Sequence, residues 1–103
     1  MTTTYDFGDG NGPVAAHRHS NGGGWVADTA KVDETAYVGL YAKVFGNARV
    51  AGNAEVSGDA EVFDNARVSG DAEVFGNARV SGNAMVFGDA EVFGNAEVSG
   101  NSR

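Results

Sequence analysis

A six-residue repeat runs along most of the chain and limits the possible folds more than any other feature. Valine returns at every sixth position from Val26 to Val98, and alanine returns at every sixth position from Ala30 to Ala96. From position 44 onward the unit reads Val-[Phe/Ser/Ala]-Gly-[Asn/Asp]-Ala-x, and Asp64 is the one replacement of its glycine. A period of six matches neither a helix nor a simple alternating strand. The chain is therefore expected to fold as a repeat protein.

Each unit predicts a short strand followed by a tight turn. In the Ala-x-Val segment, the alternation of an extended chain turns alanine and valine to one face and x to the other. The Gly-Asn and Gly-Asp pairs accept the positive φ angles that a tight turn requires. Because every strand turns the same two residue types inward, the sequence predicts an all-β chain wound around a narrow core.

Length and composition bound the number of domains. The 103 residues suffice for one small domain, and the absence of cysteine excludes disulfide bonds. Residues 1–25 lie outside the repeat and contain the Gly22-Gly23-Gly24 run, which is typical of irregular structure. We therefore predict an irregular N-terminal cap or arm at 1–25 and a β-helix of about four coils at 26–103.

The repeated unit resembles that of the hexapeptide-repeat left-handed parallel β-helix family. This resemblance implies a triangular prism with 18 residues per coil, contributed by three six-residue units, and a left-handed path between parallel strands. Within the family, Gly22-Gly23-Gly24-Trp25-Val26 followed by Val-x-Gly-Asn-Ala units is most similar to uncharacterised bacterial and prophage-type repeat proteins. The handedness is an implication of the resemblance, because parallel crossovers are otherwise right-handed.

The same resemblance raises the question of enzymatic activity. The acyltransferase and γ-type carbonic anhydrase branches of the family imply trimers with coil histidines at the subunit clefts, often beside an inserted loop. Residues 26–98 contain neither a histidine nor an insertion, so the repeat offers no residue for that chemistry. We expect a non-catalytic protein without a cofactor.

Two histidines outside the repeat keep one alternative open. His17 and His19 would lie on the same side of an extended segment, a spacing compatible with a metal ion. The alternative is therefore a trimeric enzyme of the hexapeptide class, either an acyltransferase or a metal-dependent, carbonic-anhydrase-like enzyme, that uses these leader histidines.

The 18-residue coil sorts the outward x positions into three columns, because residues 18 apart lie one strand spacing of about 4.8 Å apart. The first column is basic, the second is acidic and the third alternates in sign. They are Lys31, Arg49, Arg67 and Met85; Tyr37, Glu55, Glu73 and Glu91; and Lys43, Glu61, Arg79 and Glu97. Aromatic residues that follow the inward valines should also stack and stay partly exposed, as Phe45 on Phe63 and Phe75 on Phe93.

Like charges in register destabilise a sheet unless solvent or a partner neutralises them. The simplest partner is a second copy, since a closed ring needs two different complementary faces on each subunit. We therefore predict a homotrimeric structural or interaction module, of the kind found in phage-like or other multimeric particles. Its basic face would contact the acidic face of the next copy through Lys31, Arg49, Arg67, Glu55, Glu73 and Glu91. We also expect the last coil to touch another molecule end to end, or to continue in a longer chain.

The overall charge bears on partners and location. Seven basic and fourteen acidic residues give a net charge of −7, which disfavours nucleic acid and anionic membranes as partners. The N-terminal residues lack the basic start and apolar stretch of a secretory signal. We therefore expect a cytoplasmic protein as synthesised, with association to a particle left open.

Overall fold

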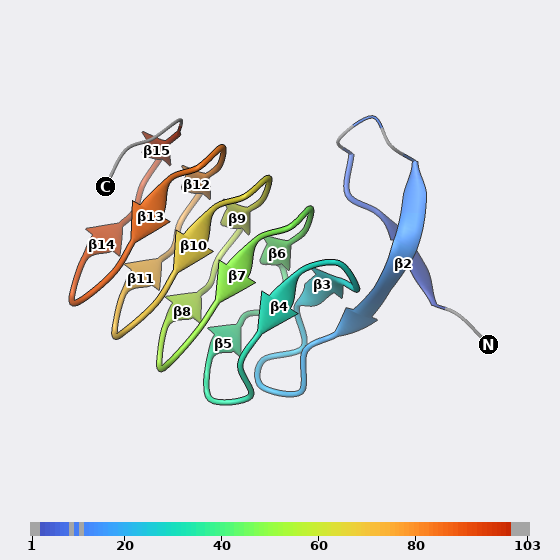
Figure 1. The fold of residues 1–103 in the computed structure, drawn as a ribbon, viewed down its shortest axis with the longest axis horizontal. Helices are drawn as coiled ribbons and strands as arrows, with labels where there is room; N and C mark the ends of the chain where they lie inside the picture. The colour runs from blue at the N-terminus through green and yellow to red at the C-terminus, as the bar shows by residue number, and fades with distance from the viewer. Residues whose placement is uncertain (1–2, 9, 11, 100–103) are drawn as a thin grey trace.

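The chain folds as a parallel β-solenoid preceded by a β-hairpin (Figure 1). The computed structural model describes residues 3–8, 10 and 12–99, and in this part of the chain there is no helix. The strands of the solenoid are β3 (Trp25–Ala27), β4 (Lys31–Val32), β5 (Tyr37–Val38), β6 (Lys43–Val44), β7 (Arg49–Val50), β8 (Glu55–Val56), β9 (Glu61–Val62), β10 (Arg67–Val68), β11 (Glu73–Val74), β12 (Arg79–Val80), β13 (Met85–Val86), β14 (Glu91–Val92) and β15 (Glu97–Val98).

Three parallel sheets form the sides of the solenoid. Their orders are β4-β7-β10-β13, β5-β8-β11-β14 and β3-β6-β9-β12-β15. Paired residues lie 18 positions apart, as Val50 and Val68 do, which confirms the predicted coil length. The strands β4 to β15 make four coils of three strands. Figure 1 shows the chain passing down through β4 in front and returning behind through β6, which is the expected left-handed winding.

The core is a column of small side chains. Alanines and valines of the repeat are buried from Val26 to Val80, except for the partly buried Val32, because each Ala-x-Val strand turns both of them inward. Since alanine and valine are small, the three sheets pack close together. The valines buried to below 2% exposure are Val26, Val38, Val44, Val50, Val56, Val62, Val68, Val74 and Val80.

A tight turn joins each strand of the repeat to the next. The turn glycines have positive φ angles, for example Gly58 at 64°, and Asp64 takes their place at 60°. In the first coil, side chains replace the Gly-Asn turn: the Thr29 and Thr35 hydroxyls donate to carbonyls one coil further on. The Asp33 carboxylate accepts the Gly52 N–H at 3.0 Å. These bonds agree with the polar turn chemistry of that coil.

The leader contributes regular structure that its composition did not indicate. Strand β1 (Thr4–Asp6) pairs antiparallel with β2 (Pro13–Arg18), and β2 pairs antiparallel with β3. The hairpin thus extends one sheet beyond the first coil, as Figure 1 shows at the N-terminal end. The division of the chain at residue 25 stays a prediction.

A second, smaller core lies where the hairpin meets the outside of the solenoid. Phe7 and Phe45 are buried there together with Ala16 and Ala27. The expected aromatic columns are confirmed, since Phe45 stacks on Phe63 at 4.9 Å and Phe75 stacks on Phe93 at 5.4 Å between ring centroids. The expected partial exposure of Phe45 is wrong, because Phe7 stacks on its other side at 4.8 Å.

Candidate interaction faces and leader site

The basic column lies along the sheet β4-β7-β10-β13. Strand register places Lys31 beside Arg49 and Arg49 beside Arg67, and Met85 follows. A groove of about 400 Å³ runs between this column and the neighbouring corner, where it is lined by Asn47, Asn65 and Asn83. Among the described residues, no carboxylate lies within ion-pair distance of these three cations. The face therefore carries positive charge that no described residue neutralises by an ion pair.

The acidic column lies along the adjacent sheet β5-β8-β11-β14. Tyr37 pairs in register with Glu55, which is followed by Glu73 and Glu91. Within the described ranges these glutamates, too, lack an ion pair. Both like-charged columns thus have the same spacing and lie on neighbouring sides of the prism.

The third column behaves differently because its charges alternate. The registers Lys43–Glu61, Glu61–Arg79 and Arg79–Glu97 follow one another along β6, β9, β12 and β15. Arg79 Nε lies 3.8 Å from Glu61 Oε1 in an exposed ion pair, which contributes up to about 1 kcal/mol. This face is neutralised within the chain and needs no partner.

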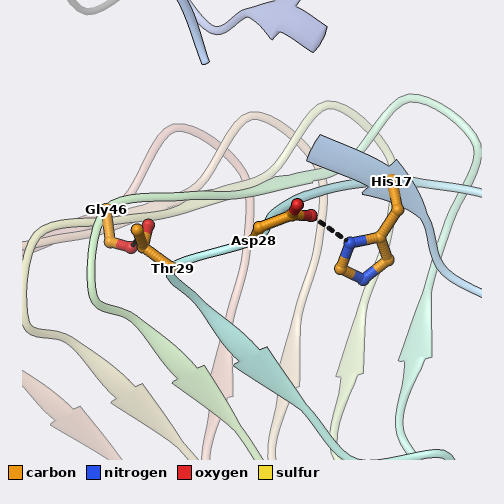
Figure 2. Close-up of polar contacts among 4 residues, drawn as sticks. All are labelled: His17, Asp28, Thr29 and Gly46. Atoms are coloured by element: carbon orange, nitrogen blue, oxygen red, sulfur yellow. Dashed lines mark hydrogen bonds and ion pairs between the residues drawn. The ribbon is translucent and has the colours of Figure 1, made fainter. Parts of the chain in front are cut away.

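The two leader histidines turn to different partners. His17 Nδ1 lies 2.7 Å from Asp28 Oδ1, and both side chains are about half exposed. Figure 2 shows this contact beside the Thr29–Gly46 hydrogen bond, at the turn that precedes β4. His19 is buried, and its Nε2 lies 2.8 Å from the Ala36 carbonyl oxygen. In the described part of the chain, no three His, Cys, Asp or Glu side chains gather as metal ligands would.

Sequence reasoning missed a cluster of aromatic and cationic side chains where the hairpin joins the solenoid. Tyr5 stacks on Trp25 at 4.6 Å between ring centroids, and the Arg18 guanidinium lies over the Trp25 ring at 4.6 Å. The Lys43 ammonium lies 5.5 Å from the centre of the Tyr5 ring. The alternation of Tyr5 with Phe7 was a signal for a strand here, but its pairing partner depends on the tertiary fold.

This cluster borders a groove of about 390 Å³. It lies beside the turn between β5 and β6, where Leu40 and Tyr41 are strongly exposed. The groove is lined by Tyr5, Arg18, Trp25, Leu40, Tyr41, Ala42, Lys43 and Asp59.

The far end of the described solenoid is more open than its middle. Ala90 and Ala96 are exposed there although the equivalent alanines of earlier coils are buried. An apolar hollow at this end is lined by Met85, Val86, Phe87, Ala90, Val92 and Val98. The end contact expected from the sequence concerns residues 100–103 as well, and these lie outside the described residues.

Comparison with known proteins supports the architecture. A family model described as the YdcK beta solenoid repeat matches residues 78–92. This segment contains β12, β13 and β14, close to one full coil, so the match shows similarity to a β-solenoid repeat. Neither a curated protein nor a solved structure matched the chain. The described residues contain no helix that is long and apolar enough to span a membrane.

Proposed function

We propose that this chain is a non-catalytic interaction module of the hexapeptide-repeat, left-handed β-helix type that assembles with copies of itself. The observation that carries the proposal is the pair of unneutralised columns, one basic and one acidic, on adjacent sheets. Such a module is made in the cytoplasm, and a phage-like or other multimeric particle is the kind of assembly it would join.

The like-charged columns give self-association its driving force. Two like charges about 5 Å apart in water repel by about 0.8 kcal/mol, and each column repeats such contacts along its length. Because both columns follow the same 18-residue period, a basic face and an acidic face match in register over the height of the solenoid. Pairing replaces several repulsions with attractions of about 0.5 kcal/mol each.

Two different complementary faces on one subunit favour a closed ring. We propose a homotrimer in which Lys31, Arg49 and Arg67 of one copy approach Glu55, Glu73 and Glu91 of the next. Two neighbouring faces of a triangular prism meet at about 60°. If the basic and acidic faces of adjacent copies lay flat against each other around a common edge, about six copies would close the ring. In a trimer the two faces would instead meet at an angle. The mass of the assembly in solution therefore distinguishes a monomer, a trimer and a larger ring.

Charge reversal tests the proposal. Replacing Glu55, Glu73 and Glu91 by lysine should give monomers in sedimentation equilibrium, because both faces of the ring then repel. Adding Lys31→Glu, Arg49→Glu and Arg67→Glu should restore the ring. The matched control reverses the whole third column, with Lys43→Glu, Glu61→Lys, Arg79→Glu and Glu97→Lys, which keeps both its alternation and its neutral sum. A wild-type chain that stays monomeric at high concentration and low salt would refute self-association.

His17 supports a second candidate, a metal-dependent enzyme of the hexapeptide class. The Asp28 carboxylate contacts Nδ1 of His17. Nε2 of His17 is then available as a metal ligand or proton carrier. Metal analysis of the purified protein before and after chelation, with His17→Ala and His19→Ala as variants, tests this candidate. Metal retained at one equivalent per ring, and lost in His17→Ala, would support it over the non-catalytic module.

A further inference from the structure

We propose that the groove beside the hairpin binds a carboxylated sugar, such as a hexuronate. Its lining combines two cations, one carboxylate and exposed apolar side chains, whereas the groove along the basic column has two cations and no carboxylate. None of the residues proposed for self-association lines it. The proposal therefore does not depend on the ring.

Both cations of the groove are held in place by contacts on the protein side. The Arg18 guanidinium lies over Trp25 at 4.6 Å and donates to the Gly23 carbonyl at 3.0 Å. The Lys43 ammonium lies 5.5 Å from the centre of the Tyr5 ring, and its neighbour in register, Glu61, pairs with Arg79 instead. Among the described residues, no carboxylate is within ion-pair distance of Arg18 or Lys43. Two positioned cations that form no ion pair with the described residues fit an anionic ligand.

The charges of the groove select the kind of anion. Arg18 and Lys43 contribute +2 and Asp59 contributes −1, so the lining sums to +1. This charge complements one carboxylate, whereas a phosphate monoester carries about −1.5 to −2 and would meet Asp59 as well. The net charge of −7 on the whole chain further disfavours polyanions. A monoanion is the better match.

The apolar and polar parts of the groove favour a sugar as the carrier of that carboxylate. Leu40 is 53% exposed and Tyr41 is 70% exposed, and both border the groove. The apolar face of a pyranose ring can pack on such a surface, since aromatic rings supply a rigid, amphipathic contact. Asp59 then accepts hydrogen bonds from sugar hydroxyls, as an ionised carboxylate can act only as an acceptor.

The single tryptophan gives a direct measurement. Trp25 is the one tryptophan of the chain and lines the groove, so its fluorescence reports occupancy. Titration with D-glucuronate or D-galacturonate should change the emission with a Kd on the order of 1 mM, as expected for a shallow groove. D-glucose should bind about 10-fold more weakly, because it lacks the carboxylate. Methyl glucuronide, which carries a single carboxylate, separates the two sources of such a sugar, since a glycosidically linked unit should bind more tightly than the free acid if the natural ligand is a glycan.

Variants with matched controls complete the test. Tyr41→Ala should weaken glucuronate binding about 3- to 10-fold, whereas Phe87→Ala, at another exposed turn, should leave it unchanged. Lys43→Gln should weaken it about 10-fold, and Lys31→Gln on another sheet should not. Equal binding of glucose and glucuronate would overturn the proposal. So would a preference for adenosine monophosphate or phenylalanine, or no response to glucuronate at about 50 mM.

Discussion

At the residue scale, identical repeats impose unequal demands on their glycines. Gly58 has a φ of 64°, and a Cβ atom built there would lie 2.9 Å from backbone atoms of Gly76 in the next coil. Gly88 has a φ of 66°, but a Cβ atom there would meet no atom within 4 Å. Both positions need the left-handed conformation, and Gly58 also needs close contact between coils.

Substitution of these two glycines separates two contributions to the free energy of unfolding: the strain of a left-handed backbone and the steric clash between neighbouring coils. Gly88→Ala should lower the free energy of unfolding by about 1 kcal/mol, the cost of an L-residue in the left-handed region. Gly58→Ala should lower it by about 3 kcal/mol, because its methyl group also displaces the Gly76 backbone. Urea denaturation of both variants measures the difference. Equal losses would show that the coils can move apart at the turns without cost.

At the element scale, the sequence accounts for the solenoid much better than for the leader. Each strand of the repeat is set by its own six residues, so period and alternation suffice to predict the strands and the inward residues. The 18-residue coil and its columns are implied by the resemblance to the hexapeptide-repeat family. The hairpin depends on pairing with β3 and on Phe7 covering Phe45, contacts between segments far apart in the sequence. The groove of Arg18 and Lys43 exists only after those contacts form. Local patterns therefore could not reveal it.

A phenylalanine pair tests how firmly the hairpin holds to the solenoid. Phe7 is buried at 5% exposure, and its truncation to alanine should cost about 3 kcal/mol and release the stack of Tyr5 on Trp25. The expected observation is a red shift of Trp25 emission at a lower denaturant concentration than the unfolding of the coils. Phe93→Ala is the control, since Phe93 is 56% exposed and should lose less than about 1 kcal/mol. A single transition in Phe7→Ala with unchanged stability would mean that the hairpin contributes nothing to the fold.

At the scale of the whole molecule, two periods are superposed. The six-residue period of alanine and valine builds the core, and the 18-residue period of the outward charges builds the faces. The core is the same for every unit, so the fold should tolerate the removal of any whole number of six-residue units, as expected when each repeat contacts mainly its neighbours. The charged faces should be preserved only when a whole coil of 18 residues is removed. Fold and charge pattern can therefore be separated by deletion.

Deleting residues 51–56 removes one six-residue unit and should leave the fold intact while abolishing self-association. The inward alanines and valines keep their order, so circular dichroism should remain that of a β protein, with stability lowered by a few kcal/mol. The charges, however, move to new sheets: Glu73 and Glu91 now follow Lys31 and Arg49 in one column, and Arg67 follows Lys43 in another.

A deletion of residues 51–68 is the matched control, because it removes one whole coil of 18 residues and preserves the basic and acidic columns at shorter length. Sedimentation at low salt should then give a monomer for the six-residue deletion and a ring, weaker than wild type, for the whole-coil deletion. A ring that survives the shorter deletion at full strength would show that something other than the charged columns holds the copies together. A shorter deletion that fails to fold would show that the faces also stabilise the single chain, because the core residues of the two variants are equivalent.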